Sequence, residues 1–580
     1  MRQCGHGGAL LAGLLAEHGV RHVFGVPGGQ TLALYDGILD RTGQLAHVLV
    51  RDERSAAYAA DAYARVTGRV GVCDATVGPG AAKLPSGLGE ALGGSVPVIA
   101  LVSELPARMA VHRYRSAASQ ALDQAALLAP VTKYLASVPD LESMPGLVRQ
   151  AFREATTGRP GPAALLLPQD VLDSPAGPCA WRAGSARFGT FPAFRPAPEP
   201  ADVAAAAAVL GRAARPFLLA GGGVMHSQAG PALTALAERL SAAVGTTLTG
   251  KGAIREDHPL SVGVVGTMGT SAAAAALAEA DVVLLAGAKA SSGATYGWTL
   301  PGADAEVVQL DIDPAELGRA FGLAAAVLGD ARAGLTALLA ALETAAGPDR
   351  RPWRARLAEL TAQWRAARDR ERASDAIPIA PQRVLGELEK ALGADDCLIC
   401  DASLASGWGG AYLEQRNAGR LVLCPRGLAG LGYGVPAAIG AAIGRAATAA
   451  DGGRTMVLTG DGALGYAVGE LATLTQLRLP VTIVVLNNRS LGWIRWYRRI
   501  TFGRGWEDDD FADVAYAEVA RGFGMLGVRV TEPGGLAHAL ASALRSDRPA
   551  LVDVVTEAWQ TPIGSHRSAV AHGAAAGYGG

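Results

Sequence analysis

The sequence is poor in cysteine and has no excess of charge of either sign, and both shortages exclude classes of protein. Six cysteines in 580 residues are too few and too scattered to cross-link the chain. Lys and Arg number 52 against 53 Asp and Glu, and no basic stripe is present that would bind nucleic acid or an anionic membrane. We therefore expect reduced thiols, a cytoplasmic location, small-molecule partners, and no nucleic-acid or membrane role.

Long apolar runs are also absent, and we expect no secretion signal. Glu17 and His18 closely follow the first apolar stretch, which lacks the cleavage pattern of a signal peptide. One of the long charge-free stretches, residues 427–444, is interrupted by glycines and Pro436, which is typical of a turn followed by a helix rather than a membrane span. Cys397 and Cys400 form a lone CxxC pair in an apolar, strand-like run, which favours buried thiols over a zinc or redox motif.

Glycine, by contrast, is abundant. Its 75 residues make up about 13% of the chain, against a usual share of about 7%. Apolar residues make up 50%, which is enough for each of three or four domains of about 150 residues to bury a core. The glycine excess indicates many tight turns or close approaches of backbone.

Short apolar runs alternate with Ala- and Leu-rich helical patterns throughout, which predicts an α/β fold of three doubly wound parallel-sheet domains. Strands are expected at residues 22–26, 47–50, 70–75, 97–102 and 163–167, then 216–220, 245–248, 282–286 and 307–312, then 397–401, 455–459, 481–487 and 550–555. The predicted boundaries are 1–173 for the first domain, 174–200 for a linker, 201–345 for the central domain, 346–378 for a helical connector, 379–560 for the third domain and 561–580 for a flexible tail.

Two short motifs follow apolar strands of the third domain. Gly460, Asp461 and Gly462 come directly after one strand, and Asn487 and Asn488 end another. Because the carboxyl ends of parallel strands meet at one edge of a sheet, the two motifs are expected to lie together. Carboxylate and carboxamide oxygens suit Mg²⁺, which also takes phosphate oxygens, and the glycines let a diphosphate approach backbone N–H groups. Either motif alone would be an ordinary turn; together they predict a site for Mg²⁺ and a diphosphate.

This pair of motifs resembles the signature of thiamine-diphosphate (ThDP) enzymes, and the rest of the chain is similar to the large catalytic subunit of acetolactate synthases. The segments that carry the resemblance are, in chain order, residues 22–29, 65–73, 78–80, 131–133, 250–252, 258–259, 311–316 and 434–440. The resemblance spans about residues 10–555. It implies pyrimidine-binding, central and diphosphate-binding domains, ThDP and Mg²⁺ as cofactors, and a 2-oxo acid and a carbonyl acceptor as substrates.

The resemblance also assigns cofactor contacts. Glu53 matches the glutamate that hydrogen-bonds the aminopyrimidine and is the predicted catalytic proton relay. Leu431 matches the apolar residue that bends the cofactor, and the carbonyl of Ala429 would accept the amino hydrogen. The residues that match metal ligands are Asp461, Asn488 and Ser490, and those that match the diphosphate contacts are Gly460, Gly462, Ala463, Asn488 and Ser490.

The same resemblance also assigns residues near the thiazolium and the substrate. The loop of Pro27, Gly28, Gly29 and Gln30 would approach the thiazolium, with Gly29 counted among the catalytic positions, and Gln120 resembles a glutamine of the substrate pocket. Gly80, in the turn after the third strand, would contact the cofactor. In this superfamily the glutamate and the diphosphate site come from different subunits. A homodimer or homotetramer with active sites at the subunit interface is therefore expected.

Several positions depart from the family pattern. Residues 401–406 replace the usual Gly-Gln-His segment, which leaves Ser403 as the one donor there. Asp52 stands where the family has a histidine before the glutamate, and Lys83 stands where it has an asparagine. Both changes alter the charge near the cofactor.

Aromatic residues alter the predicted substrate pocket, in which Gln30, Lys83 and Gln120 are also placed. Trp493 replaces a methionine, and Trp496 and Tyr497 straddle the position of the family's tryptophan. A single methylene in a pocket changes binding by about 1–3 kcal/mol, so a wall of this bulk bears on the substrate. Acetolactate synthase-like chemistry leads, and a decarboxylase or aldehyde lyase acting on a bulkier donor such as benzoylformate is the alternative.

The sequence of the central domain leaves open whether a second ligand binds there. Residues 220–223, 266–270 and 311–313 resemble segments that hold FAD in acetolactate synthases, although packing turns would explain the same glycines. Residues 289–293 lack the arginine that contacts the flavin. An oxidoreductase built on the central domain would need a complete G-x-G-x-x-G there, which the cluster at residues 221–223 lacks, and a non-catalytic relative would have lost Glu53.

Overall fold

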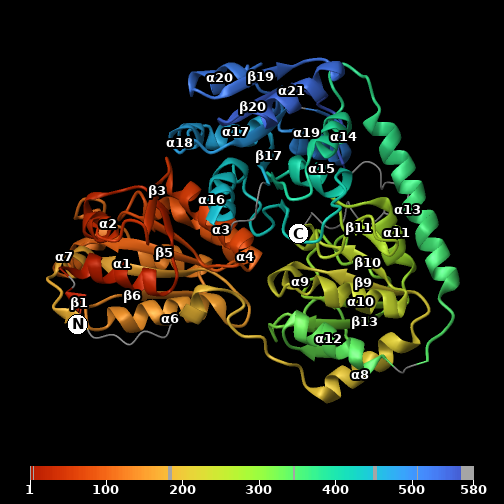
Figure 1. Ribbon diagram of the computed structural model, residues 1–580, viewed down its shortest axis with the longest axis horizontal. Coiled ribbons are helices and arrows are strands. Elements are labelled where there is room, and N and C mark those ends of the chain that lie inside the picture. Colours follow the sequence, from red (N-terminus) through yellow and green to blue (C-terminus); the bar gives the residue numbers. More distant parts are fainter. Residues whose placement is uncertain are drawn as a thin grey trace. The chain divides into compact units, whose positions relative to one another are not determined.

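In the computed structural model the residues described are 2–3, 5–179, 186–343, 346–447, 453–505 and 507–562. These residues form three six-stranded sheets whose strands are all parallel, and a two-stranded antiparallel ribbon of β1 (Arg2–Gln3) and β8 (Pro178–Cys179) (Figure 1). The predicted three-domain α/β fold is confirmed. The predicted tail lies outside the described residues from residue 563 onward.

The chain divides into two compact units. The first contains residues 1–194 together with two later segments, 425–450 and 467–479. Its sheet has the order β3-β2-β4-β5-β7-β6. The strands are β2 (His22–Gly25), β3 (Ala46–Leu49), β4 (Gly71–Ala75), β5 (Val98–Glu104), β6 (Tyr134–Ser137) and β7 (Ala163–Pro168). The helices are α1 (Gly7–Glu17), α2 (Leu32–Leu39), α3 (Glu53–Thr67), α4 (Leu84–Gly94), α5 (Gln124–Leu128), α6 (Met144–Thr156), α7 (Gln169–Asp173), α16 (Gly434–Ala447) and α18 (Glu470–Gln476).

Helix α16 packs along α3, although the two helices are far apart in the sequence. The close approach depends on Gly440, because a Cβ at this position would collide with the backbone of Ala59. Gly444 continues the same contact against Thr67 and Tyr63. Two helices from the segment assigned by sequence to the third domain thus belong to the first compact unit.

The second unit holds two sheets. The sheet of the central domain has the order β11-β10-β9-β12-β13-β14. Its strands are β9 (Pro216–Ala220), β10 (Ala243–Thr246), β11 (Ser261–Val264), β12 (Val282–Ala286), β13 (Glu306–Asp311) and β14 (Ala325–Leu328). Its helices are α8 (Pro200–Arg212), α9 (Gly222–His226), α10 (Gly230–Leu240), α11 (Ser271–Glu279) and α12 (Ala331–Ala341).

The other sheet of this unit has the order β16-β15-β17-β18-β20-β19. Its strands are β15 (Cys397–Cys400), β16 (Val422–Leu423), β17 (Thr455–Gly460), β18 (Val481–Asn487), β19 (Leu526–Val530) and β20 (Ala550–Val555). The remaining helices are α14 (Pro381–Ala391), α15 (Leu404–Tyr412), α17 (Asp461–Ala467), α19 (Gly492–Phe502), α20 (Tyr516–Gly522) and α21 (Leu536–Leu544). Cys397 and Cys400 are buried and form no disulfide, as predicted.

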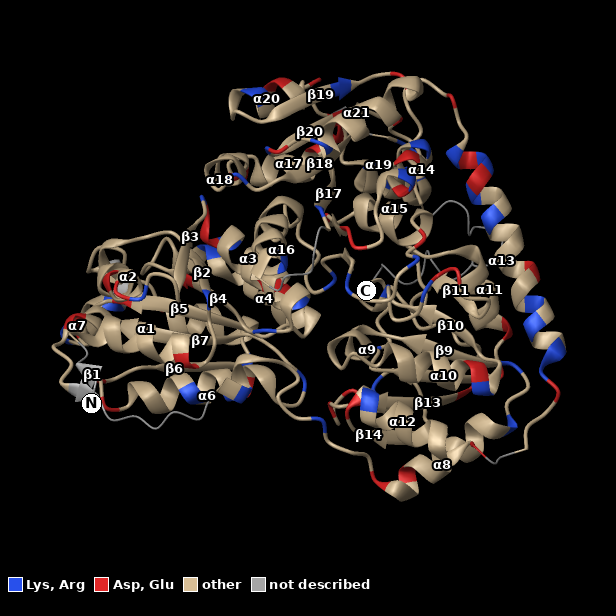
Figure 2. Ribbon diagram, viewed as in Figure 1, with Lys and Arg blue, Asp and Glu red and all other residues tan. Residues whose placement is uncertain are grey.

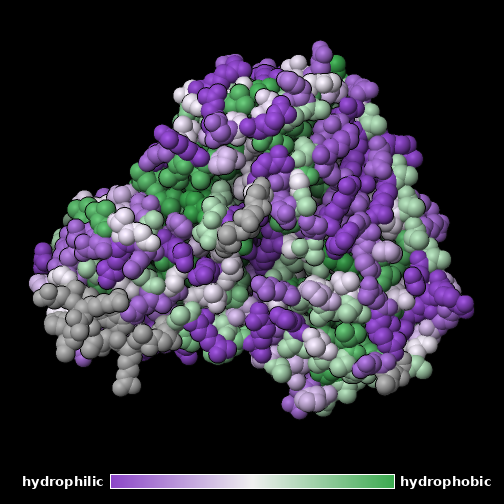
Figure 3. Space-filling model, viewed as in Figure 1, coloured by the Kyte–Doolittle hydropathy of each residue, from purple (hydrophilic) through white to green (hydrophobic). Residues whose placement is uncertain are grey.

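The connector between these two sheets is the helix α13 (Arg351–Arg372), within the predicted 346–378. Trp353, Leu357, Leu360 and Trp364 are buried along one side, at the spacing of successive helical turns. The charged residues of α13 are arginines together with Glu359, Asp369 and Glu371 (Figure 2), and the exposed surface of the helix is hydrophilic (Figure 3). Among the described residues, no helix combines the length and apolarity needed to span a membrane.

Candidate active site

Glu53 is placed by the turn between β3 and α3. It is the first residue of α3, where a carboxylate is favoured by the positive end of the helix dipole. The side chain of Asp52 caps the helix by accepting a hydrogen bond from the Arg54 N–H at 2.9 Å. Glu53 is 5% exposed. The local sequence therefore builds a buried carboxylate at the carboxyl end of a parallel strand.

Lys83 lies between the two neighbouring acids. Its Nζ is 3.2 Å from Glu53 Oε2 and 3.3 Å from Asp52 Oδ2. Burial opposes the charge on Lys83, but Glu53 and Asp52 outweigh it and raise the pKa of this lysine, so it stays cationic at neutral pH. Glu53 Oε2 is buried and has no partner with hydrogen-bond geometry. Apart from the ammonium of Lys83, this oxygen has no partner among the described residues, and it could accept a hydrogen bond from a ligand group.

A turn after β4 gathers several other predicted residues. Gly80 lies beside Glu53, because a Cβ there would come 2.8 Å from Glu53 Oε1. Thr76 Oγ1 donates to Gln30 Oε1 at 2.9 Å, and Gln30 Nε2 donates to Gln120 Oε1 at 3.4 Å. Gln30, Glu53, Gly80, Lys83 and Gln120 thus surround one turn.

The remaining predicted positions of this region border the same turn. Gly28 abuts Thr76, where a Cβ would collide with the threonine side chain. Gly29 and Pro27 are exposed, and the space beside Gly29 is open. Sequence reasoning missed Thr76, although it stands at the carboxyl end of β4, where ligand contacts concentrate.

A buried acid next to this region was also missed. Asp74 of β4 is fully buried and accepts a hydrogen bond from the Tyr35 hydroxyl at 2.8 Å, and Tyr35 in turn contacts His47 Nε2 at 3.1 Å. Burial, reinforced by the charge of Glu53, raises the pKa of Asp74 to about 8, and burial lowers the pKa of His47 to about 4. At neutral pH Asp74 is largely protonated and His47 is neutral. A single acid in an otherwise apolar strand was the available signal.

The loop before α16 carries Ala429 and Leu431. Ala429 has a φ of +55°, in the left-handed region, and Leu431 is half-buried. Gly430 between them leaves room for Tyr58, whose hydroxyl would lie 2.8 Å from a Cβ at that position. This strained backbone holds a half-buried leucine in a fixed place.

In the second unit, Asp461 begins α17 directly after β17 and is 3% exposed. Its carboxylate accepts hydrogen bonds from the N–H of Gly462 at 2.9 Å and of Arg489 at 2.6 Å. Burial raises the pKa of Asp461 to about 6, against the effect of these backbone bonds. Among the residues that the structure describes, no Lys, Arg or His pairs with this carboxylate.

The turn after β18 lies against Asp461. Asn488 Oδ1 accepts from the Ser490 N–H at 3.1 Å, and the carbonyl of Ser490 accepts from the Gly492 N–H at 2.9 Å. Each oxygen keeps a lone pair free. Among the described residues no group of three His, Cys, Asp or Glu residues could hold a metal ion, and this mixed set of oxygens is the candidate metal site. A buried carboxylate without a cationic partner fits a divalent cation.

The predicted diphosphate contacts differ in their surroundings. The space beside Gly460 is open, whereas a Cβ at Gly462 would come 3.0 Å from the ring of Phe511. Ala463 is buried. Ser403 precedes α15 with a φ of +64°, and its side chain makes no capping hydrogen bond. Its hydroxyl thus remains available.

The predicted aromatic wall lies on α19. The rings of Trp493 and Trp496 are 5.8 Å apart between centroids. Trp493 is half-buried and packs against the core, and Tyr497 is half-buried one turn further on. Aromatic bulk is therefore present on this helix, partly as core packing.

The glycines of the central domain are used for packing. Gly221 and Gly223, at the start of α9, lie against the backbone of Gly287 after β12, where added Cβ atoms would collide. Gly266 similarly abuts the backbone of Gly293 and Ala294. Backbone packing thus explains these glycines without a dinucleotide, and neither the contacts nor the residue types single out FAD.

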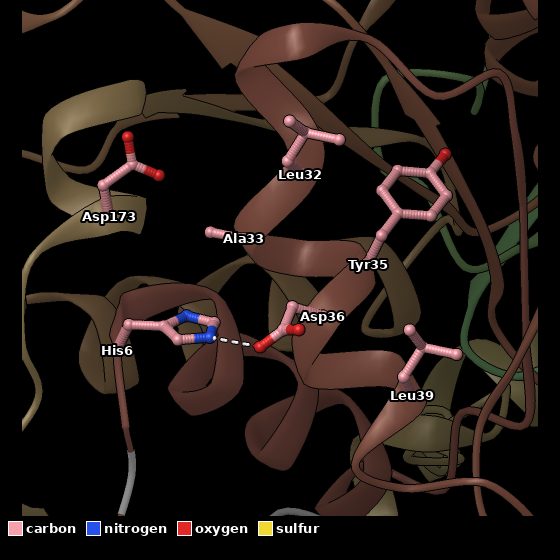
Figure 4. A pocket seen from close by; sticks show the side chains of 7 residues that line it. All are labelled: His6, Leu32, Ala33, Tyr35, Asp36, Leu39 and Asp173. Carbon is pink, nitrogen blue, oxygen red and sulfur yellow. Dashed lines mark hydrogen bonds and ion pairs between the residues drawn. The ribbon is translucent and has the colours of Figure 1, made fainter.

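A surface hollow of about 500 Å³ lies elsewhere on the first unit (Figure 4). Exposed Leu32 and Leu39 of α2 line it, together with His6 and Asp36, which pair at 2.9 Å. None of the predicted site residues lines this hollow.

Comparison with known families matches all three domains. The family models "thiamine pyrophosphate enzyme, N-terminal TPP binding domain", "central domain" and "C-terminal TPP binding domain" match residues 5–127, 203–338 and 401–554. Thiamine pyrophosphate (TPP) is another name for ThDP.

Full-length relatives are also similar. The probable acetolactate synthase large subunit of Methanocaldococcus jannaschii is 34% identical over 95% of this chain and 91% of its own length. The acetolactate synthase isozyme 2 large subunit of Escherichia coli is 33% identical over 93% of each chain. The probable 2-ketoarginine decarboxylase AruI of Pseudomonas aeruginosa is 37% identical over 84% of this chain and 83% of its own length. The chain thus belongs to the thiamine pyrophosphate enzyme family and is a ThDP-dependent enzyme of the acetolactate synthase type.

Proposed function

We propose that this enzyme holds ThDP with Mg²⁺, decarboxylates a 2-oxo acid such as pyruvate, and transfers the two-carbon unit to a second 2-oxo acid. The observation that carries the proposal combines two features. The first is the buried Glu53, whose Oε2 is paired with Lys83 but accepts no hydrogen bond. The second is the oxygen set of Asp461, Asn488 and Ser490, which has no cationic partner among the described residues. When bound, ThDP supplies the carbon nucleophile that attacks the 2-oxo carbonyl.

The residues of the chain hold and orient the reactants. Asp461, Asn488 and the Ser490 carbonyl would hold Mg²⁺, and Gly460 leaves space through which a diphosphate can approach backbone N–H groups. Glu53 would hold a proton at a ring nitrogen, and burial keeps water from competing for it. Leu431 and the carbonyl of Ala429 would fix the ring beside Glu53.

A second candidate is decarboxylation of a bulkier 2-oxo acid. The aromatic residues Trp493, Trp496 and Tyr497 and the similarity to a probable 2-ketoarginine decarboxylase favour it. FAD has no role in either reaction as proposed, because packing explains the glycines that suggested it.

The proposed active form is a homodimer or homotetramer, since the resemblance assigns Glu53 and the metal ligands to different subunits. Sedimentation of the purified protein with and without ThDP and Mg²⁺ tests this assignment. A monomer at concentrations that support turnover would contradict it.

The substrate is tested with purified protein, ThDP, Mg²⁺ and a panel of pyruvate, 2-oxobutyrate, benzoylformate and 2-ketoarginine, with products identified by mass spectrometry. An acetohydroxy acid from pyruvate supports the first candidate, and faster CO₂ release from benzoylformate or 2-ketoarginine selects the second. Absence of product from every acid would refute both.

Glu53→Gln tests the proposed role of Glu53 as the proton relay. Loss of its general acid–base role should lower turnover by about 10²- to 10⁴-fold while the Kd for ThDP stays close to that of the wild type. The control, Glu142→Gln, removes an exposed carboxylate of the same unit. Unchanged turnover in Glu53→Gln would remove Glu53 from the mechanism.

A further inference from the structure

One buried carboxylate accepts four successive backbone N–H groups from a distant loop. Glu90, in α4, is fully buried. Its Oε1 accepts from the N–H of Arg426 and of Gly427, each at 2.7 Å. Its Oε2 accepts from the N–H of Leu428 and of Ala429, each at 2.9 Å. The carboxylate therefore fixes the backbone from residue 426 to Ala429, two residues before Leu431.

The sequence of α4 provides room for this contact. Gly427 lies directly against the backbone of Glu90 and of Gly93, where an added Cβ would collide. Gly89 accommodates the side chain of Leu428 in the same way. Gly89 and Gly93 lower the helix propensity of α4, so the close approach of the loop offsets a local cost. The contact is built by both segments and does not depend on the carboxylate alone.

A charged network fixes the carboxylate in turn. Arg65 Nη2 lies 3.5 Å from Glu90 Oε1, and Arg65 Nε donates to Asp61 Oδ2 at 2.7 Å. The hydroxyl of Tyr433 donates to the same Asp61 oxygen at 2.8 Å. Tyr433 lies at the far end of the loop, so its two ends are tied to one network. A buried anion with four N–H donors and an arginine is well compensated.

We infer that Glu90 is a positioning residue that holds the loop of residues 425–432 in the conformation by which Ala429 and Leu431 contact the aminopyrimidine of ThDP. The inference rests on the proposed function for the cofactor contacts, and on the four hydrogen bonds for the loop. No other side chain type replaces Glu90 without loss. A glutamine would turn an NH₂ group toward two N–H donors, and an aspartate is one methylene shorter.

The first test compares Glu90→Gln with the wild type in the presence of ThDP and Mg²⁺. We measure the Kd for ThDP by fluorescence titration and, at saturating ThDP without substrate, the rate of hydrogen–deuterium exchange at C2 of the thiazolium. A misplaced ring should slow C2 exchange by about 10-fold or more even when the site is full. A residue that only stabilises the fold would lower Tm without changing exchange per bound cofactor.

Glu104→Gln is the matched control. Glu104 is likewise buried in the first unit, accepts the Leu105 N–H and pairs with Arg113, but does not contact residues 426–429. Its C2 exchange should equal that of the wild type. Equal exchange rates for Glu90→Gln and the wild type would overturn the inference.

The second test needs only the wild-type protein and so does not depend on the variant folding. Amide hydrogen exchange of peptides covering residues 425–432 is followed by mass spectrometry without ThDP. Four N–H groups bound to Glu90 should exchange about 100-fold more slowly than in an unfolded chain. Rapid exchange would overturn the inference. A wild type that is protected here but binds no ThDP would instead refute the proposed function, leaving Glu90 as the residue that orders the loop.

Discussion

The two regions proposed to hold the cofactor differ in which groups compensate the charge of their carboxylates. In the first unit, side-chain cations balance the acids: Lys83 lies beside Glu53 and Asp52, and Arg65 beside Asp61 and Glu90. In the second unit, Asp461 is held by backbone N–H groups without a paired cation among the described residues. The first region is thus prepared for a ligand group without charge, and the second for a group that brings a cation. This division agrees with an aminopyrimidine at one end of ThDP and a Mg²⁺-bound diphosphate at the other.

The largest effect is expected from removing the negative charge of Asp461, which has no paired side-chain cation among the described residues. Asp461→Asn keeps the size of the side chain but removes the anionic ligand, and we expect the affinity for ThDP at fixed Mg²⁺ to fall by 100-fold or more, about 2.7 kcal/mol. Isothermal titration measures it.

The control for this variant is Asp547→Asn, which removes an exposed carboxylate of the same unit and should bind ThDP like the wild type. If Asp461→Asn bound ThDP as tightly as this control, the metal site would have to lie elsewhere.

A smaller effect is expected from removing Lys83, which balances the charges of Glu53 and Asp52 in the first unit. Lys83→Met removes an ammonium that stays charged at neutral pH next to Glu53, and kcat/KM for an anionic 2-oxo acid should drop by about 10-fold while the Kd for ThDP changes little. Because the Lys83 side chain is 48% exposed, the effect should weaken with added salt.

Steady-state kinetics at two salt concentrations measure this change. The control is Lys390→Met, which removes an exposed lysine of α14 that pairs with Glu387. Wild-type kcat/KM in Lys83→Met would place the lysine outside the substrate pocket.

A separate effect, on stability rather than on binding or turnover, concerns the buried Asp74 beside the first region. Because the pKa of Asp74 is raised to about 8 in the folded protein, its contribution to stability is complete below about pH 4 and is lost as the pH rises toward 8. Asp74→Asn keeps an acceptor for Tyr35 but does not titrate. The Tm of the wild type should therefore fall relative to that of the variant between pH 4 and pH 8.

Thermal unfolding across this range measures the difference, with Asp40→Asn as an exposed control on the same unit. Parallel Tm profiles for Asp74→Asn and the wild type would show that Asp74 is ionised in the folded protein.

The strands of the three parallel sheets that sequence patterns missed share one property. β6, β11, β14, β16 and β19 are all edge strands, whereas every central strand was predicted. Central strands of a parallel sheet are buried on both faces and form largely continuous apolar runs, as residues 98–102 of β5 do. An edge strand such as β6 is largely half-exposed, and its sequence resembles that of a loop. The bounds of β10 also differ from the prediction: the strand covers residues 243–246 instead of 245–248.

The site divides in a similar way. Glu53, Asp461 and Asn488 stand in turns directly after strands, so their position along the sequence indicates where they lie in the fold. Their roles as relay and metal ligands, the domain boundaries and the cofactor contacts remain predictions.

Asp74 and Glu90 could not be identified in this way. Asp74 lies inside a strand that is otherwise apolar, and Glu90 lies within a helix whose loop partners follow more than 300 residues later. The sequence alone determined the three parallel sheets and the acids at their carboxyl ends, because the pattern of a strand and the residues that end it depend only on neighbouring positions in the sequence. Only the tertiary structure decided which charges are balanced, because compensation by Lys83, Arg65 or backbone N–H groups depends on which distant segments pack together.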